Sequence, residues 1–304
     1  MDWQALFGMD DDVDSGFVGN LPPGPMTLTD SHAWASDCLS RLSARFGDQV
    51  ANFLQGNLDH GIYITSHYSG WGTEFAAKPY IMRAASDAGL KVDDTVGLVH
   101  WGACDISETC RWVLANHKSS TRPQHVFADV MDYLPATRRC ALTHVLENYQ
   151  DLVAVAEGEH DPASAVADLN QACLREYFGV LEPVKFHKSM KAWCSIHSKF
   201  CHVFPQRRHI SSRALHIEVA GTTCTAHCAI GSHAKWMDPS VLPCLEWLFM
   251  MMAISPDVCV HENSPMFPHE HSAKDAAEDE DPICGVFSSR PWSALPEGQT
   301  LHEV

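Results

Sequence analysis

Short apolar runs bounded by glycine or polar residues recur along the chain and alternate with stretches of helical spacing. The apolar runs predict five buried strands, at residues 61–66, 95–102, 125–128, 214–220 and 257–261. Apolar residues three and four positions apart predict helices at 31–46, 49–54, 74–88, 107–117, 138–155, 163–177 and 238–253. Asp238 is the expected N-cap of the last helix. Strands that alternate with helices are typical of a doubly wound, Rossmann-like α/β sheet.

Two kinds of segment interrupt this pattern. Residues 133–213 contain two long helical stretches and are predicted to be a helical insertion. Residues 1–30 and 268–304 are acidic and poor in periodic apolar positions, so we expect disordered tails around a single domain at 31–267. The tails carry twelve of the seventeen net negative charges. The remaining domain is not basic, which argues against autonomous nucleic-acid binding.

The cysteine content and the lack of a long apolar run indicate in which cellular compartment the protein is found. The chain has 12 cysteines without the even framework of a small secreted domain, and residues 1–14 lack the features of a secretory signal. The longest apolar run, at 242–254, is interrupted by Pro243 and Glu246 and is too short to span a bilayer. We therefore expect an intracellular protein in a reducing compartment, with no membrane partner.

Candidate chemistry gathers at the carboxyl ends of the predicted strands, where open α/β sheets bind their ligands. The first strand runs into Tyr68-Ser69-Gly70-Trp71-Gly72, a turn that lets backbone approach a ligand ahead of a helix N-terminus. Asp105 and Asp129 follow the second and third strands. Cys224 follows the fourth strand, and Glu262 and Asn263 close the fifth.

In their order and spacing, these motifs resemble the cytosine-C5 DNA methyltransferases, specifically a divergent eukaryotic branch. The resemblance covers residues 60–132 and 214–267. It implies that S-adenosylmethionine is the cofactor and that its site contains Tyr68, Ser69, Gly70, Gly72, Asp105 and Asp129. It also implies a catalytic set of Cys224, Glu262 and Asn263. The Cys224 thiolate would add to cytosine C6, which makes C5 nucleophilic, and Glu262 would assist at N3 of a base flipped out of DNA.

The chain also departs from the family's pattern. Thr223 and Thr225 flank the cysteine where the family has proline and glutamine. After Phe267 there is no Gln-x-Arg-x-Arg motif and no target-recognition domain. The expectation is a truncated nuclear methyltransferase acting on DNA or RNA, with a partner protein supplying the missing recognition elements. The alternative is a catalytically inactive methyltransferase-fold binding module.

One cysteine-histidine cluster falls inside the insertion. Cys194, His197, Cys201 and His202 have a spacing that would suit zinc. Such clusters also arise by chance in a chain with 12 cysteines and 19 histidines. We favour chance here and predict no metal site; the alternative is a zinc-stabilised helical adaptor built around residues 194–202.

Overall fold

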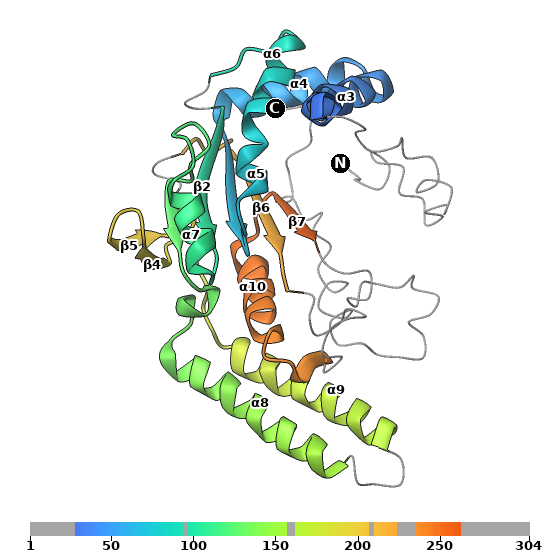
Figure 1. Cartoon of the computed structure of the whole chain (residues 1–304), viewed down its shortest axis with the longest axis vertical. Coiled ribbons are helices and arrows are strands. Elements are labelled where there is room, and N and C mark those ends of the chain that lie inside the picture. Colours follow the sequence, from blue (N-terminus) through green and yellow to red (C-terminus); the bar gives the residue numbers. More distant parts are fainter. Residues whose placement is uncertain (1–27, 94–96, 157–161, 207–209, 224–234, 263–304) are drawn as a thin grey trace.

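The computed structural model describes residues 28–93, 97–156, 162–206, 210–223 and 235–262 (Figure 1). Its centre is a five-stranded sheet in the order β3-β2-β1-β6-β7 in which all neighbours run parallel. The strands are β1 (Ile62–His67), β2 (Leu98–Cys104), β3 (His125–Phe127), β6 (Leu215–Gly221) and β7 (Val258–Glu262). This arrangement confirms the predicted α/β class and is consistent with a Rossmann-like fold.

Helices flank the sheet (Figure 1). They are α3 (Leu28–Phe46), α4 (Asp48–His60), α5 (Thr73–Ala76), α6 (Lys78–Asp87), α7 (Glu108–Ala115), α8 (Ala136–Ala156), α9 (Pro162–Leu181) and α10 (Val241–Ile254). Two short 3₁₀ helices, η1 (Val130–Tyr133) and η3 (Lys235–Met237), lie beside α8, α9 and α10. No described helix has the length and apolar content that crossing a bilayer requires.

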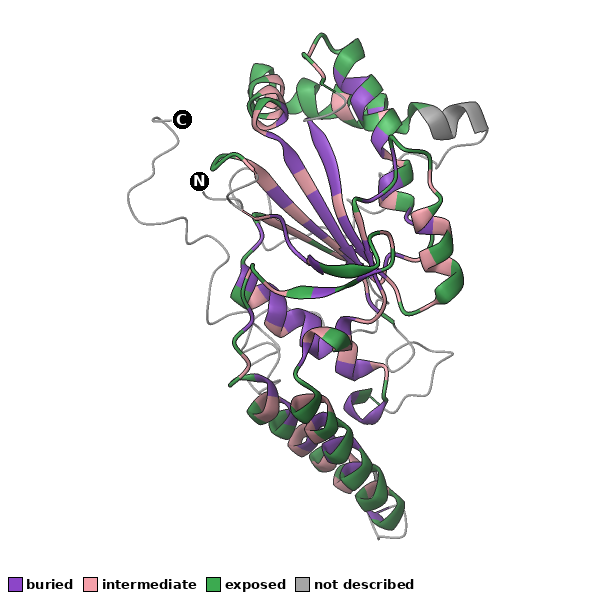
Figure 2. Ribbon diagram, turned by 90° about the vertical axis from the view of Figure 1, so that its left-hand side faces the viewer, coloured by how far each residue is buried: buried purple, intermediate pink, exposed green. Residues whose placement is uncertain are grey.

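The sheet divides the core into two clusters because side chains of each strand alternate between its faces. On one face, Ile62 and Ile64 of β1 pack with Phe75, Met82 and Leu114 from the helices around α5, α6 and α7. The other face carries the larger cluster, which includes nearly the whole of α10 and the bases of α8 and α9. Figure 2 shows the buried strands between these layers and the more exposed arm below them.

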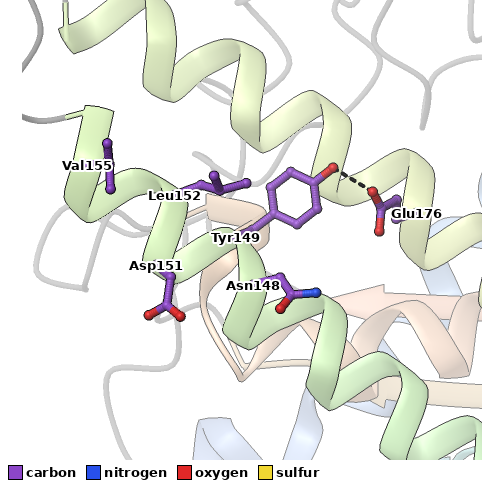
Figure 3. A pocket seen from close by; sticks show the side chains of 6 residues that line it. All are labelled: Asn148, Tyr149, Asp151, Leu152, Val155 and Glu176. Atoms are coloured by element: carbon purple, nitrogen blue, oxygen red, sulfur yellow. Dashed lines mark hydrogen bonds between the residues drawn. The ribbon is translucent and has the colours of Figure 1, made fainter.

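Helices α8 and α9 form an antiparallel arm that projects from the sheet domain (Figure 1). The Tyr149 hydroxyl of α8 donates a hydrogen bond of 2.8 Å to Glu176 Oε1 of α9. A hollow between the two helices is lined by Asn148, Tyr149, Asp151, Leu152, Val155 and Glu176 (Figure 3). These residues come from the arm alone, so the hollow is separate from the strand ends.

Three details of the sequence prediction need correction. The insertion is not wholly helical, because β4 (Lys191–Cys194) and β5 (Lys199–His202) form an antiparallel hairpin within it. Asp238 does not cap α10, which begins at Val241. Its Oδ1 instead accepts from the backbone N–H of Ser240 at 2.8 Å, within the turn before the helix. Helix α3 begins at Leu28, inside the predicted tail, while 1–27 and 268–304 lie outside the described residues.

Candidate functional site

The turn after β1 is tightly wound. Tyr68, Gly70 and Gly72 all have positive φ, at 58°, 53° and 75°. A Cβ added to Gly72 would lie 2.7 Å from side-chain carbons of Leu114 and Phe75, so the turn fits glycine there on both conformation and space. Tyr68 adopts a conformation that costs a side-chain-bearing residue energy, and such outliers cluster at functional sites.

Asp105 links the end of β2 to this turn. Its Oδ2 accepts from the backbone N–H of Gly70 at 2.7 Å, and its Oδ1 accepts from the backbone N–H of Ser107 at 2.8 Å. The Ser69 hydroxyl is buried and bonds to backbone groups of Ser66 and Cys104. The structure therefore brings Ser69, Gly70 and Asp105 together, but much of their hydrogen-bonding capacity serves the turn itself.

Asp129 ends β3 and begins η1. Its Oδ1 accepts from the backbone N–H of Met131 at 2.9 Å, which makes it the N-cap of that 3₁₀ helix. The side chain is half-buried, and its second oxygen has no hydrogen-bond partner within the described part of the chain. Asp105 and Asp129 thus place two carboxylates at neighbouring strand ends.

Glu262 lies across the sheet from this pair, at the end of β7. It stands opposite Gly221 of β6 in the strand register. A Cβ placed on Gly221 would lie 3.4 Å from Glu262 Oε2 and 4.0 Å from the Tyr68 carbonyl oxygen. The ends of β1, β6 and β7 therefore meet. Of the other two predicted catalytic residues, Cys224 and Asn263 both lie outside the described residues.

Beneath the strand ends, a polar network missed by sequence reasoning is buried against α10. Glu218 of β6 is fully buried and is hydrogen-bonded to Thr65, to His67 Nδ1 and to Trp247 Nε1, the last at 3.2 Å. Thr65 Oγ1 also lies 2.8 Å from His216 Nε2, and burial lowers the pKa of His216 to about 4. The sequence signal for this network is the alternation of polar and apolar residues at 214–220, which puts His216 and Glu218 on the same face of the strand.

A second buried acid lies nearby on α10. Glu246 is fully buried, and neither carboxyl oxygen has a hydrogen-bond partner in the described structure. Burial, followed by the proximity of Asp129, raises the pKa of Glu246 well above its usual value. The Tyr68 hydroxyl is likewise buried without a partner there, and its ring packs against the larger core cluster. The predicted cofactor-binding tyrosine thus points its polar end inward.

Together these groups lie at the turning point of the sheet. The chain passes outward from β1 to β2 and β3, then returns to the other side of β1 for β6 and β7. In such sheets the crevice at the reversal is the usual binding position. No family model matches the chain, and no curated protein matches it either.

Proposed function

We propose that the protein is an S-adenosylmethionine-dependent methyltransferase that acts on cytosine C5 in a nucleic acid. The observation that carries the proposal is the reversal of strand order between β1 and β6. The loops that leave these two strands contain the glycine turn and, in sequence, the stretch leading to Cys224. Ligands of open α/β sheets bind at this position.

The residues present suit the proposed cofactor. Two half-buried carboxylates, Asp105 and Asp129, end adjacent strands, and the second retains an unused oxygen for a hydroxyl or amino donor. The glycine turn permits close backbone approach. Bound S-adenosylmethionine would supply an electrophilic methyl group. On the chain's side, Asp105, Asp129 and the turn would bind and orient it.

The catalytic part of the proposal rests on Cys224, Glu262 and Asn263. A thiolate at Cys224 would form a bond to C6 of the base, and a carboxyl at Glu262 would hold or donate a proton at N3. Glu262 is exposed at the end of β7, so a base entering beside Gly221 and Tyr68 would reach it without displacing packed side chains.

One observation favours the second candidate, an inactive methyltransferase-fold binding module that works through a partner protein. Both oxygens of Asp105 already accept backbone N–H groups, so its carboxylate stabilises the turn even without a ligand. An inactive protein that still needs this turn for folding would therefore keep an acid at position 105. The two candidates make different predictions about covalent chemistry.

Cofactor binding is tested by calorimetric titration of the full chain with S-adenosylmethionine. We expect binding by the wild type and a loss of about 1.5–3 kcal/mol, roughly ten- to 150-fold in affinity, in Asp105→Ala. Asp87→Ala is the matched control, because Asp87 is an exposed acid on α6 that pairs with Arg83 one helical turn away. A wild-type protein that binds no cofactor would refute the proposal.

Catalysis is tested with DNA and RNA oligonucleotides that contain 5-fluorocytosine, which traps the covalent adduct because the fluorine cannot be eliminated. We expect the wild type with cofactor to form an adduct with one of them. Cys140→Ala, which removes an exposed thiol on α8, should still do so, and Cys224→Ala should not. Cofactor binding without any wild-type adduct would reject catalysis in favour of the binding module.

A further inference from the structure

A cluster of potential metal ligands lies away from the strand-end site, where the β4–β5 hairpin meets β3. His125 begins β3, Cys194 ends β4, His197 lies in the hairpin turn and Cys201 belongs to β5. One ligand atom from each lies within 4.8 Å of all the others. Cys194 is fully buried and Cys201 nearly so.

The distances match a tetrahedral zinc site. With Zn–S near 2.3 Å and Zn–N near 2.0–2.1 Å, tetrahedral geometry places sulfur and nitrogen ligands about 3.5–3.6 Å apart. Here Cys194 Sγ lies 3.4 Å from His197 Nδ1 and 3.8 Å from His125 Nδ1, and Cys201 Sγ lies 3.6 Å from His197 Nδ1. We propose that His125, Cys194, His197 and Cys201 bind a structural zinc ion.

Hydrogen bonding alone explains the cluster poorly. Thiols are weak donors and acceptors, yet both sulfurs approach the same nitrogen, His197 Nδ1, which can accept a single proton. A cation among two thiolates and two imidazoles would satisfy all four groups at once.

The ligand set differs from the one that sequence spacing suggests. The local pattern ends in His202, but His202 Nδ1 lies 3.2 Å from the Ser189 carbonyl oxygen. Because side chains alternate along β5, His202 and Cys201 point to opposite faces of that strand. The fourth ligand is instead His125, which is 69 residues before Cys194. The site therefore joins the hairpin to the sheet, rather than closing a loop within the hairpin.

This connection gives the ion a structural role. The hairpin strands are only four residues each, and a short isolated hairpin is marginally stable in water. A backbone hydrogen bond of 2.8 Å from Ser195 N–H to the Val126 carbonyl already attaches its turn to β3. Zinc would fix the same junction through side chains, as structural Cys₂His₂ sites do.

The first experiment measures zinc in the purified full chain by elemental analysis, after dialysis against zinc-free buffer. We expect about one zinc per chain in the wild type, and loss of stoichiometric zinc in Cys194→Ser and His125→Asn. His202→Asn and Cys140→Ser are matched controls that should retain it, since one bonds elsewhere and the other lies exposed on α8.

A second measurement covers the case in which a ligand variant fails to fold. Wild-type protein freed of metal by a chelator and titrated with Co²⁺ should show the intense visible bands of tetrahedral cobalt and a thiolate charge-transfer band. A wild type that holds neither zinc nor cobalt overturns the proposal. Loss of metal in His202→Asn, with retention in His125→Asn, overturns it in favour of the local motif.

Discussion

Replacing Glu246 by glutamine should make the protein more stable, and more so at higher pH. Glu246 is fully buried on α10 without a hydrogen-bond partner in the described structure, and burial raises its pKa well above 4.5. Below pH 4.5 the carboxyl is protonated in both folded and unfolded chains, so its burial carries no pH-dependent cost. Above that pH the unfolded chain releases the proton while the folded chain retains it, which favours unfolding.

The size of the effect follows from proton linkage. While the folded carboxyl stays protonated, folding is weakened by about 1.4 kcal/mol for each pH unit above the unfolded pKa. Glutamine keeps the shape and removes the titration. The stability of Glu246→Gln relative to wild type should therefore rise with pH, by about 1.4 kcal/mol per pH unit while the folded carboxyl stays protonated. This trend stops once pH passes the folded pKa.

Urea unfolding at pH 5.5, 6.5 and 7.5, followed by tryptophan fluorescence, measures this difference. The neighbouring Trp247 is buried and should report the loss of core packing. Glu108→Gln, at an exposed position in the first turn of α7, shows the effect of one lost surface charge. A stability difference for Glu246→Gln that does not change with pH would refute the reasoning, because the folded carboxyl would then titrate as it does in the unfolded chain.

Two further substitutions test the packing at the strand ends. Gly72→Ala should lower the free energy of unfolding by about 2–3 kcal/mol in urea titrations, because the new methyl group would meet Leu114 in addition to the strain of positive φ. Gly89→Ala has the same strain but open space, so it should cost only about 1 kcal/mol, and equal losses would contradict the packing explanation. Glu218→Ala should cost about 3–5 kcal/mol by the same assay, because it leaves His67 buried without its partner. A loss below about 1 kcal/mol would show that water replaces the carboxylate there.

Local pattern predicted the sheet well because β1, β2 and β3 are mostly buried apolar runs, and the strands are bounded by glycine or polar residues. All five strands occur within a few residues of their expected positions, including Val258–Glu262 at the edge. Helix ends were less predictable. Asp238 has the residue type of an N-cap, but the turn formed with Ser240 delays α10 by three residues. Such competition between a cap and a turn depends on tertiary packing.

Long-range partners were beyond sequence reasoning. The position of Asp105 at a strand end was predictable, whereas its bond to the Gly70 N–H depends on how two loops meet in space. The pairing of His125 with Cys194 likewise arises only when the hairpin folds against β3. Glu218 is a polar residue in a strand predicted to be buried, and its hydrogen-bond partners become visible only once α10 is placed against the sheet.

The arm formed by α8 and α9 implies an uneven distribution of local stability along the molecule. The short helix η3 is hydrogen-bonded to both helices. Gln150 Nε2 of α8 donates to the Met237 carbonyl oxygen, and the Trp236 N–H donates to Asn170 Oδ1 of α9, each at 3.1 Å. Beyond that point α8 exposes Leu152 and Val155, so its end is supported mainly by its antiparallel neighbour. Backbone amides there should exchange with solvent through local fraying, long before those at the base of the arm, which open only when the domain unfolds. The arm would thus lengthen and shorten its ordered part without disturbing the sheet.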